Sequence, residues 1–160
     1  AEEAGIAVAP TGLVPFSHWT PPARPGRRFS TWFFLTAASG ADGGTVQVDG
    51  GEITEHRWVR PAAAHRERDE GRIELTPPTW ISLWALRDHG DVRSALAATA
   101  ARQPERFATR IAIVGDEVHA LYTGDVAYDL VADDETAATR PGPRHRLRMG
   151  AGPWVYERDR

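Results

Sequence analysis

Two adjacent carboxylates, Glu2 and Glu3, lie near the start of the sequence, with Gly5 shortly after them. Residues 1–4 are typical of the last turn of a helix, and Gly5 suits the left-handed position just beyond it. Carboxylate oxygens grouped at a helix end are ligands that Mg²⁺ and Mn²⁺ prefer. A cation held there would shield a diphosphate and help to generate a nucleophilic water. A solvated helix face is the commoner reason for paired glutamates, so both interpretations stay open on these residues alone.

Two adjacent arginines, Arg27 and Arg28, follow Arg24 and precede an aromatic run over residues 29–37. A planar guanidinium binds phosphate oxygens through two parallel hydrogen bonds. Arginines at the entry of a strand can therefore hold the phosphates of a substrate. A basic surface patch without a ligand is the alternative.

Glu52, Glu55 and Trp58 recur at every third position in a short segment beside Gly50 and Gly51. A loop carboxylate can act as a general base or as a further metal ligand, and a tryptophan can supply a stacking wall. The alternative is that the glutamates are solvated and that Trp58 belongs to the core.

Composition excludes several kinds of chemistry. The chain has 160 residues and no cysteine, which excludes disulfides, thiolate catalysis and cysteine-rich zinc sites. The net charge of −3 gives no general attraction to nucleic acid. No apolar run reaches the roughly 18 to 20 residues that span a bilayer. We therefore expect a cytoplasmic protein that acts on a small molecule, with no nucleic-acid or membrane partner.

The six histidines are scattered, and no pair has the spacing of metal ligands on a helix. His145 lies between Arg144 and Arg146, so we expect it at the surface. The sequence also lacks a Gly-x-Ser-x-Gly motif, a glycine-rich phosphate loop and a dinucleotide fingerprint. The acidic and arginine-containing segments therefore remain as the candidates for chemistry.

The first third of the chain that must position these residues has the character of strands. Residues 13–19 carry strand-like side chains and end at a Thr-Pro-Pro sequence. Residues 29–37 are dense in aromatic and apolar side chains, which predicts a central strand buried on both faces. Residues 45–48 and 55–59 are short strand candidates.

The middle of the chain has helix signals. A helix over residues 61–68 begins with a proline, which is favoured at the first helical position. Thr76 precedes two further prolines and predicts the start of a second helix, which Gly90 ends. Asp91 can cap a third helix that runs to about Gln103.

The last third changes back to strands. Two apolar runs separated by a Gly-Asp pair predict a β-hairpin over residues 111–122. Residues 133–142 are polar and contain proline and glycine, which favours a loop. Residues 145–149 and 154–156 are short strand candidates.

Residues 1–6, Ala-Glu-Glu-Ala-Gly-Ile, resemble the tail of the Nudix box, the helical motif of a superfamily of metal-dependent pyrophosphohydrolases. That motif ends in Arg-Glu, two spacers, Glu-Glu, one spacer, glycine and an aliphatic residue. The earlier glycine, the isolated glutamate and the Arg-Glu pair would precede Ala1. We therefore expect the chain to be the C-terminal part of such a domain.

The segments that follow are similar, in order, to the coenzyme A diphosphatase branch of that superfamily, and the similarity covers about residues 1–90. Related sequences carry an aspartate after Arg-Arg-Phe, where this chain has Ser30. The similar segments are Trp19-Thr20-Pro21, Arg27-Arg28-Phe29, Phe33-Phe34, Glu52 with Trp58 and Pro61-Ala62-Ala63, and Leu75-Thr76-Pro77-Pro78-Thr79.

The resemblance implies an α/β fold, the Nudix-type α/β/α sandwich around a mixed sheet, with its first strands and most of the Nudix helix missing from this chain. We expect residues 1–104 to be the C-terminal portion of that domain. Residues 105–160 would be a β-rich extension that contains the hairpin. Without its partner strands such a sheet exposes edges, so we expect a fragment of a longer product.

The implied activity is the Mg²⁺- or Mn²⁺-dependent hydrolysis of coenzyme A, an acyl-coenzyme A or a related nucleoside diphosphate conjugate. Glu2 and Glu3 would bind the metal, and Glu3 and Glu52 would be the catalytic carboxylates. Arg27, Arg28 and Glu55 would bind substrate. Two alternatives remain. The domain could be an inactive ligand-binding module or a truncated remnant, and the region from residue 111 onward could form a homodimer interface.

Overall fold

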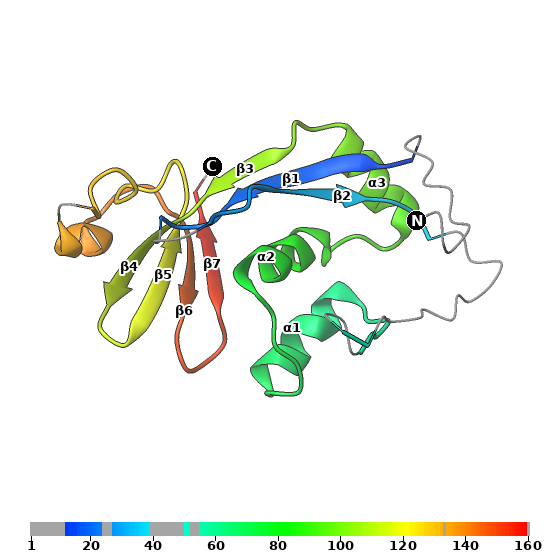
Figure 1. The fold of residues 1–160 in the computed structure, drawn as a ribbon, viewed down its shortest axis with the longest axis horizontal. Helices are drawn as coiled ribbons and strands as arrows, with labels where there is room; N and C mark the ends of the chain where they lie inside the picture. Colours follow the sequence, from blue (N-terminus) through cyan, green and yellow to red (C-terminus); the bar gives the residue numbers. More distant parts are fainter. Residues whose placement is uncertain (1–11, 24–26, 39–49, 52–54, 133, 160) are drawn as a thin grey trace.

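The structure, a computed structural model, describes residues 12–23, 27–38, 50–51, 55–132 and 134–159. These residues form a mixed α and β fold with two sheets and three α-helices, as the sequence predicts at this coarse level. The sheets lie side by side, and α2 (Pro77–Leu86) lies below the first sheet and beside β7 (Val155–Arg158) of the second (Figure 1). Within the described ranges, no helix is long and apolar enough to cross a bilayer.

The first sheet joins segments from distant parts of the sequence, in the order β2-β1-β3. The central strand β1 (Val14–Thr20) pairs antiparallel with β2 (Thr31–Leu35) and parallel with β3 (Glu105–Ala108). The prediction of a strand over residues 13–19 is confirmed. Strand β3 was not predicted, and it begins directly after the expected boundary at residue 104. The region beyond that boundary therefore shares a sheet with β1.

An irregularity in β1 changes which of its side chains are buried. The register with β2 shifts between Pro15 and Ser17. Proline has no N–H to give to a neighbouring strand, so a central strand accommodates it at such a position. As a result Phe16 and Ser17, which are adjacent in sequence, are both buried.

Among the described strands, β2 lies at the edge of its sheet, and the prediction of a central strand buried on both faces is wrong for these residues. Phe33 packs towards the core, but Trp32 and Phe34 on the other face are 46% and 49% exposed. An apolar run reports hydrophobicity and does not distinguish an edge from a centre. The imidazole of His18 stacks on Trp32, with the ring centroids 4.6 Å apart, and covers part of this outer face.

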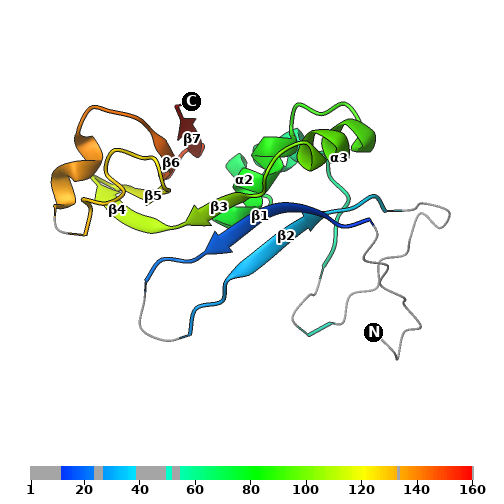
Figure 2. The same ribbon diagram turned by 90° about the horizontal axis from the view of Figure 1, so that it is seen from above.

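The three helices begin where local signals predict. α1 (Pro61–Asp69) and α2 both start with a proline, and α3 (Val92–Ala100) starts after Asp91, whose carboxylate accepts a hydrogen bond from the amide of Ser94 at 2.7 Å. α2 ends at Leu86, before the predicted stop at Gly90. Seen from above, α3 lies on the side of β1 and β3 away from β2 (Figure 2).

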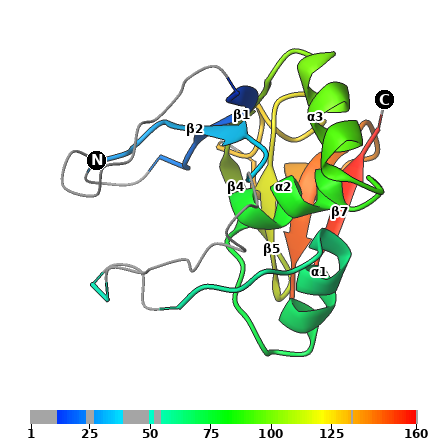
Figure 3. The same cartoon turned by 90° about the vertical axis from the view of Figure 1, so that its right-hand side faces the viewer.

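The second sheet has the order β4-β5-β6-β7 and is antiparallel throughout. The predicted hairpin is confirmed as β4 (Arg110–Val114) and β5 (Glu117–Leu121). Gly115 has a φ of 60°, as the first central residue of a tight hairpin turn requires. β6 (His145–Met149) and β7 confirm the two later strand predictions. α1 and α2 lie in front of this sheet when it is seen from the right of Figure 1 (Figure 3).

Two irregular segments complete the description. Residues 55–60 have no regular secondary structure, so the predicted strand over residues 55–59 is wrong. The predicted strand over residues 45–48 lies outside the described residues. Within the polar segment 133–142, where a loop was expected, Glu135–Thr139 forms a 3-10 helix.

One hydrophobic core joins both sheets. The indole of Trp19 on β1 stacks on Phe107 of β3, and Tyr122, just after β5, contacts both rings edge-on. Trp80 and Ile81 of α2 belong to the same cluster of buried residues. The C-terminal strands are therefore packed into the same core as β1 and α2.

Candidate functional site

A groove of about 560 Å³ opens where the two sheets meet the start of α2. We call it the arginine-rimmed groove. Its walls come from the end of β1, the segment before β2, the α2 start and one face of the second sheet. The lining residues are Trp19, Thr20, Pro21, Pro22, Arg27, Arg28, Phe29, Thr31, Phe33, Thr76, Pro77, Pro78, Thr109, Ile111, Val118, Ala120 and Met149.

The base of this groove is rigid and apolar. Trp19 is held by its stack on Phe107 at 3.9 Å between ring centroids, and its indole N–H donates to Ser17 Oγ at 2.9 Å. Phe33 contacts the same indole edge-on. Because these contacts fix the ring, Trp19 offers an ordered surface to a ligand.

Arg27 and Arg28 supply the charge of the groove. Of the described residues that line it, they are the only charged ones. Both are exposed, and neither guanidinium makes a hydrogen bond or an ion pair within the described part of the chain. Arg146 and Arg148, in contrast, are paired with carboxylates. Within the described part of the chain, the groove therefore carries two positive charges without a partner and favours an anionic ligand.

The start of α2 forms part of the groove wall but offers few hydrogen-bond donors. A helix N-terminus usually binds anions through its free amides. Here Pro77 and Pro78 occupy the first two helical positions and have no N–H, and the amide of Trp80 donates to the Thr76 carbonyl at 2.8 Å. Phosphate binding in this groove therefore depends chiefly on the arginines.

The structure brings together only some of the predicted site residues. Arg27 and Arg28 line one groove, whereas Glu55 is exposed and is not among the lining residues. Trp58 is 71% exposed, so it belongs neither to the core nor to the groove. The sequence offered no local signal for the wall formed by Ile111 and Val118, because they approach Arg28 only through the tertiary fold.

The predicted metal ligands cannot be placed. Glu2, Glu3 and Glu52 lie outside the described residues. Among the residues that are described, no group of three or more histidine, aspartate or glutamate side chains could hold an ion. Glu55 alone is not a metal site. The described residues therefore do not provide the donor set that the resemblance implies.

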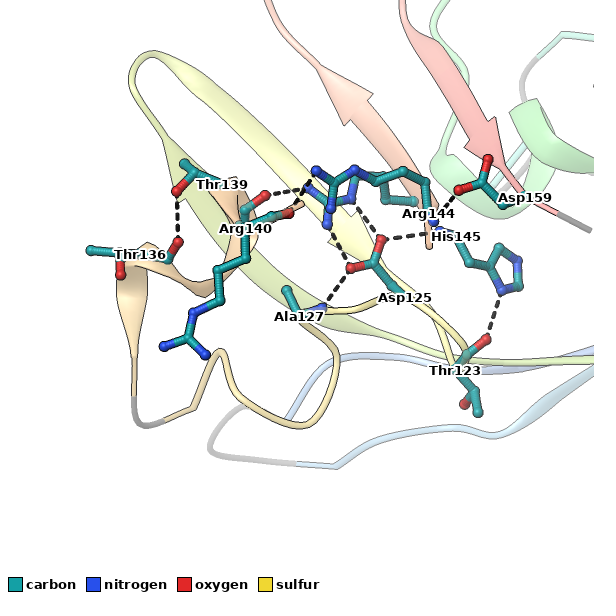
Figure 4. Close-up of polar contacts among 11 residues, drawn as sticks. Thr123, Asp125, Ala127, Thr136, Thr139, Arg140, Arg144, His145 and Asp159 are labelled. Atoms are coloured by element: carbon teal, nitrogen blue, oxygen red, sulfur yellow. Dashed lines mark hydrogen bonds and ion pairs between the residues drawn. The ribbon is translucent and has the colours of Figure 1, made fainter. Parts of the chain in front are cut away.

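A buried polar cluster lies on the far side of the second sheet, and local sequence features did not reveal it. The Nε and Nη2 atoms of Arg146 donate to the two carboxylate oxygens of Asp125, each at 2.6 Å, and Nη1 donates to the Ala138 carbonyl at 2.7 Å. Asp125 also accepts from the backbone amides of His145 and Ala127 (Figure 4). Burial alone would raise the pKa of Asp125, but these hydrogen bonds outweigh it and hold that pKa below its ordinary value.

His145 contacts this cluster through its backbone amide, whereas its imidazole packs among Phe107, Tyr122 and Tyr156. The prediction that it lies at the surface is therefore wrong. It is 8% exposed, and burial lowers its pKa because the charged imidazolium is disfavoured. Its Nδ1 lies 2.8 Å from the Thr123 carbonyl and its Nε2 lies 2.8 Å from Tyr156 Oη. A carbonyl can only accept, so Nδ1 carries the proton and Nε2 accepts from the tyrosine. The cluster satisfies its own groups and serves the fold.

A second, smaller cavity of about 260 Å³ lies between α2, α3 and β3. Glu105 and Arg158 in its wall form an ion pair at 2.6 Å. Arg102 lies over the Phe16 ring, 5.0 Å from the centroid. Since these charged groups already have partners, this cavity attracts a charged ligand less than the arginine-rimmed groove does.

Comparisons with known proteins leave the family open. Searches against protein-family models, curated proteins and solved structures gave no significant match. A functional proposal therefore depends on the groove and on the order of motifs in the sequence.

Proposed function

We propose that this chain is part of a Nudix-type pyrophosphohydrolase of the coenzyme A diphosphatase branch, and that the arginine-rimmed groove binds its substrate. One observation carries the proposal. Three of the segments that resemble this family, around Trp19, Arg27 and Thr76, line the same groove, although the segment around Thr76 is far along the chain from the other two. Segments that act on one ligand are expected to converge in this way.

The proposed reaction is attack of water on one phosphorus of a diphosphate, with cleavage of the bond to the bridging oxygen. Arg27 and Arg28 would bind phosphate oxygens and reduce the charge that repels the nucleophile. The resemblance assigns a divalent cation to Glu2 and Glu3, which supplies further charge neutralisation. Glu52 is the proposed general base. Glu55, being exposed and outside the groove, would bind only a part of the substrate that projects into solvent.

The finer fold assignment is part of the same proposal. The sheet β2-β1-β3 with α2 on one side would form part of the α/β/α sandwich. Residues from 105 onward would complete the groove, because Ile111, Val118 and Met149 line one of its walls. This arrangement favours a direct share of the C-terminal region in ligand binding over a purely dimer-forming role.

The test is hydrolysis of coenzyme A by the product of the full reading frame, with Mg²⁺ or Mn²⁺. Cleavage of the diphosphate would give adenosine 3′,5′-bisphosphate and 4′-phosphopantetheine, which chromatography separates. We expect Glu3→Gln to abolish turnover. We expect Arg27→Ala and Arg28→Ala each to raise KM about tenfold, since each removes charge-assisted hydrogen bonds.

Arg93→Ala is the matched control, because it removes an exposed arginine on α3 outside the groove. The control should leave KM unchanged. Unchanged turnover in Glu3→Gln would contradict the assignment. Tight, arginine-dependent binding with no product after hours would instead favour the inactive binding module.

A further inference from the structure

The wall of the groove opposite the arginines is a patterned apolar surface. Ile111 on β4 lies directly opposite Ala120 on β5, and Val118 on β5 lies directly opposite Met149 on β6. Side chains alternate along a strand, so these two cross-strand pairs share one face of the sheet. That face lines the arginine-rimmed groove.

The same face continues past the groove towards the hairpin turn. Ile113 lies directly opposite Val118, and it is 62% exposed. An apolar strip therefore runs from the buried Ala120 outward to an isoleucine that the described residues leave largely uncovered. Contiguous exposed apolar surface beside a polar rim is typical of a ligand-binding surface.

The charged and apolar parts of the groove are adjacent. Arg28 and Ile111 both line this groove, and they also line a neighbouring hollow together. A ligand that reaches from one to the other must be anionic at one end and apolar at the other. The volume of about 560 Å³ suits a small molecule, for which sites of roughly 300 to 1,000 Å³ are usual.

We propose that the strip formed by Ile111, Ile113, Val118 and Met149 binds the acyl chain of the substrate, so that the protein prefers acylated coenzyme A to the free thiol. This inference rests on the proposed function and names the substrate class within it. The phosphates lie at Arg27 and Arg28, and the chain follows the second sheet towards the turn. Each methylene that the strip buries strengthens binding by up to about fourfold.

The experiment measures binding of coenzyme A, hexanoyl-coenzyme A and decanoyl-coenzyme A to the full chain by calorimetry, with EDTA present so that no metal-dependent turnover occurs. We expect affinity to rise at least tenfold from the free thiol to the decanoyl thioester. Val118→Thr keeps the β-branched shape and places a hydroxyl on the strip. It should reduce this preference about threefold, because decanoyl-coenzyme A should lose more affinity than coenzyme A does.

Val155→Thr is the matched control, because Val155 is a half-exposed strand valine on the opposite face of the same sheet. It should leave the preference intact. Val118→Phe narrows the groove and should weaken decanoyl binding more than coenzyme A binding. Circular dichroism on each variant checks that the sheet is retained.

The outcomes separate the two levels of the proposal. Arginine-dependent binding of coenzyme A that does not change with chain length would overturn the acyl-chain inference and leave the proposed function standing. No binding of any of the three ligands would overturn both. A change in molecular mass with Ile113→Thr, without any change in ligand preference, would assign the strip to a dimer interface and overturn the inference.

Discussion

The ring of Trp19 lies flat on the ring of Phe107, with centroids 3.9 Å apart and planes inclined by 6°. The two residues face each other across the parallel pair β1 and β3. Because Trp19 also forms the base of the arginine-rimmed groove, this contact links the stability of the core to the shape of the candidate site.

Phe107→Ala should therefore destabilise the core and disturb the shape of the arginine-rimmed groove. It removes a buried ring, which lowers the free energy of unfolding by about 3 to 5 kcal/mol. Urea denaturation measures this loss. Phe34→Ala on the exposed face of β2 is the control and should cost much less. Equal losses in the two variants would contradict the role assigned to the stack.

Asp125→Asn should be strongly destabilising. It leaves the Arg146 guanidinium buried without a counter-charge, which costs about 3 to 5 kcal/mol. Asp129→Asn is the control, because Asp129 is exposed and lies 3.6 Å from Arg110, where an ion pair contributes about 1 kcal/mol at most. Adding Arg146→Met to Asp125→Asn should recover part of the loss, since the buried charge is then removed as well.

His145 should make stability depend on pH. Its folded-state pKa is lowered by burial, whereas the unfolded value is about 6.5. Between the two values the unfolded chain binds more protons, so stability falls as pH drops below about 6.5. Thermal unfolding between pH 8 and pH 5 measures the slope.

His145→Gln should flatten this slope, although it lowers stability at pH 8 through the lost hydrogen bonds. His56→Gln, at an exposed position, should keep the slope of the unchanged protein. A slope in His145→Gln as steep as in His56→Gln would rule out His145 as its source.

Gly142→Ala should destabilise the loop before β6. Gly142 has a φ of 146°, and a Cβ at this position would lie 2.7 Å from Val126 Cγ2. We expect a loss of about 1 to 3 kcal/mol from the unfavourable backbone conformation and the close contact. Gly152→Ala is the control, because no described residue other than its chain neighbours has an atom within 4 Å of its Cβ position. Val126→Ala should remove the contact with Cγ2 but keep the Cβ that lies 2.9 Å away, and it does not change the backbone conformation, so it should rescue only part of the loss.

Local sequence signals predicted the helix starts and the hairpin. They did not predict features that depend on contacts between distant segments of the chain. Pro77 and Asp91 each mark a helix start within their own turn, and the Gly115 turn marks a hairpin, so these were predictable. The four residues of β3 become a strand only by pairing with β1. The imidazole of His145 is buried among Phe107, Tyr122 and Tyr156, which come from two other strands and the segment just after β5.

In the candidate site too, some residues could be predicted from local sequence and others could not. Arg27 and Arg28 were predicted from residue type and their place before a strand, and the structure puts both at one groove. The apolar wall opposite them comes from β4, β5 and β6, and its residues are ordinary strand residues in the sequence. Only the packing of the second sheet against the first turns them into part of a site.

The parallel pairing of β1 with β3 also has a consequence for biosynthesis. Trp19 meets Phe107 only after about 90 further residues have been made. At roughly 5 to 20 residues per second, the ribosome takes on the order of 5 to 20 s to deliver them. During that interval β1 lacks its parallel neighbour, so the unpaired edge of the strand is open to pairing with another chain.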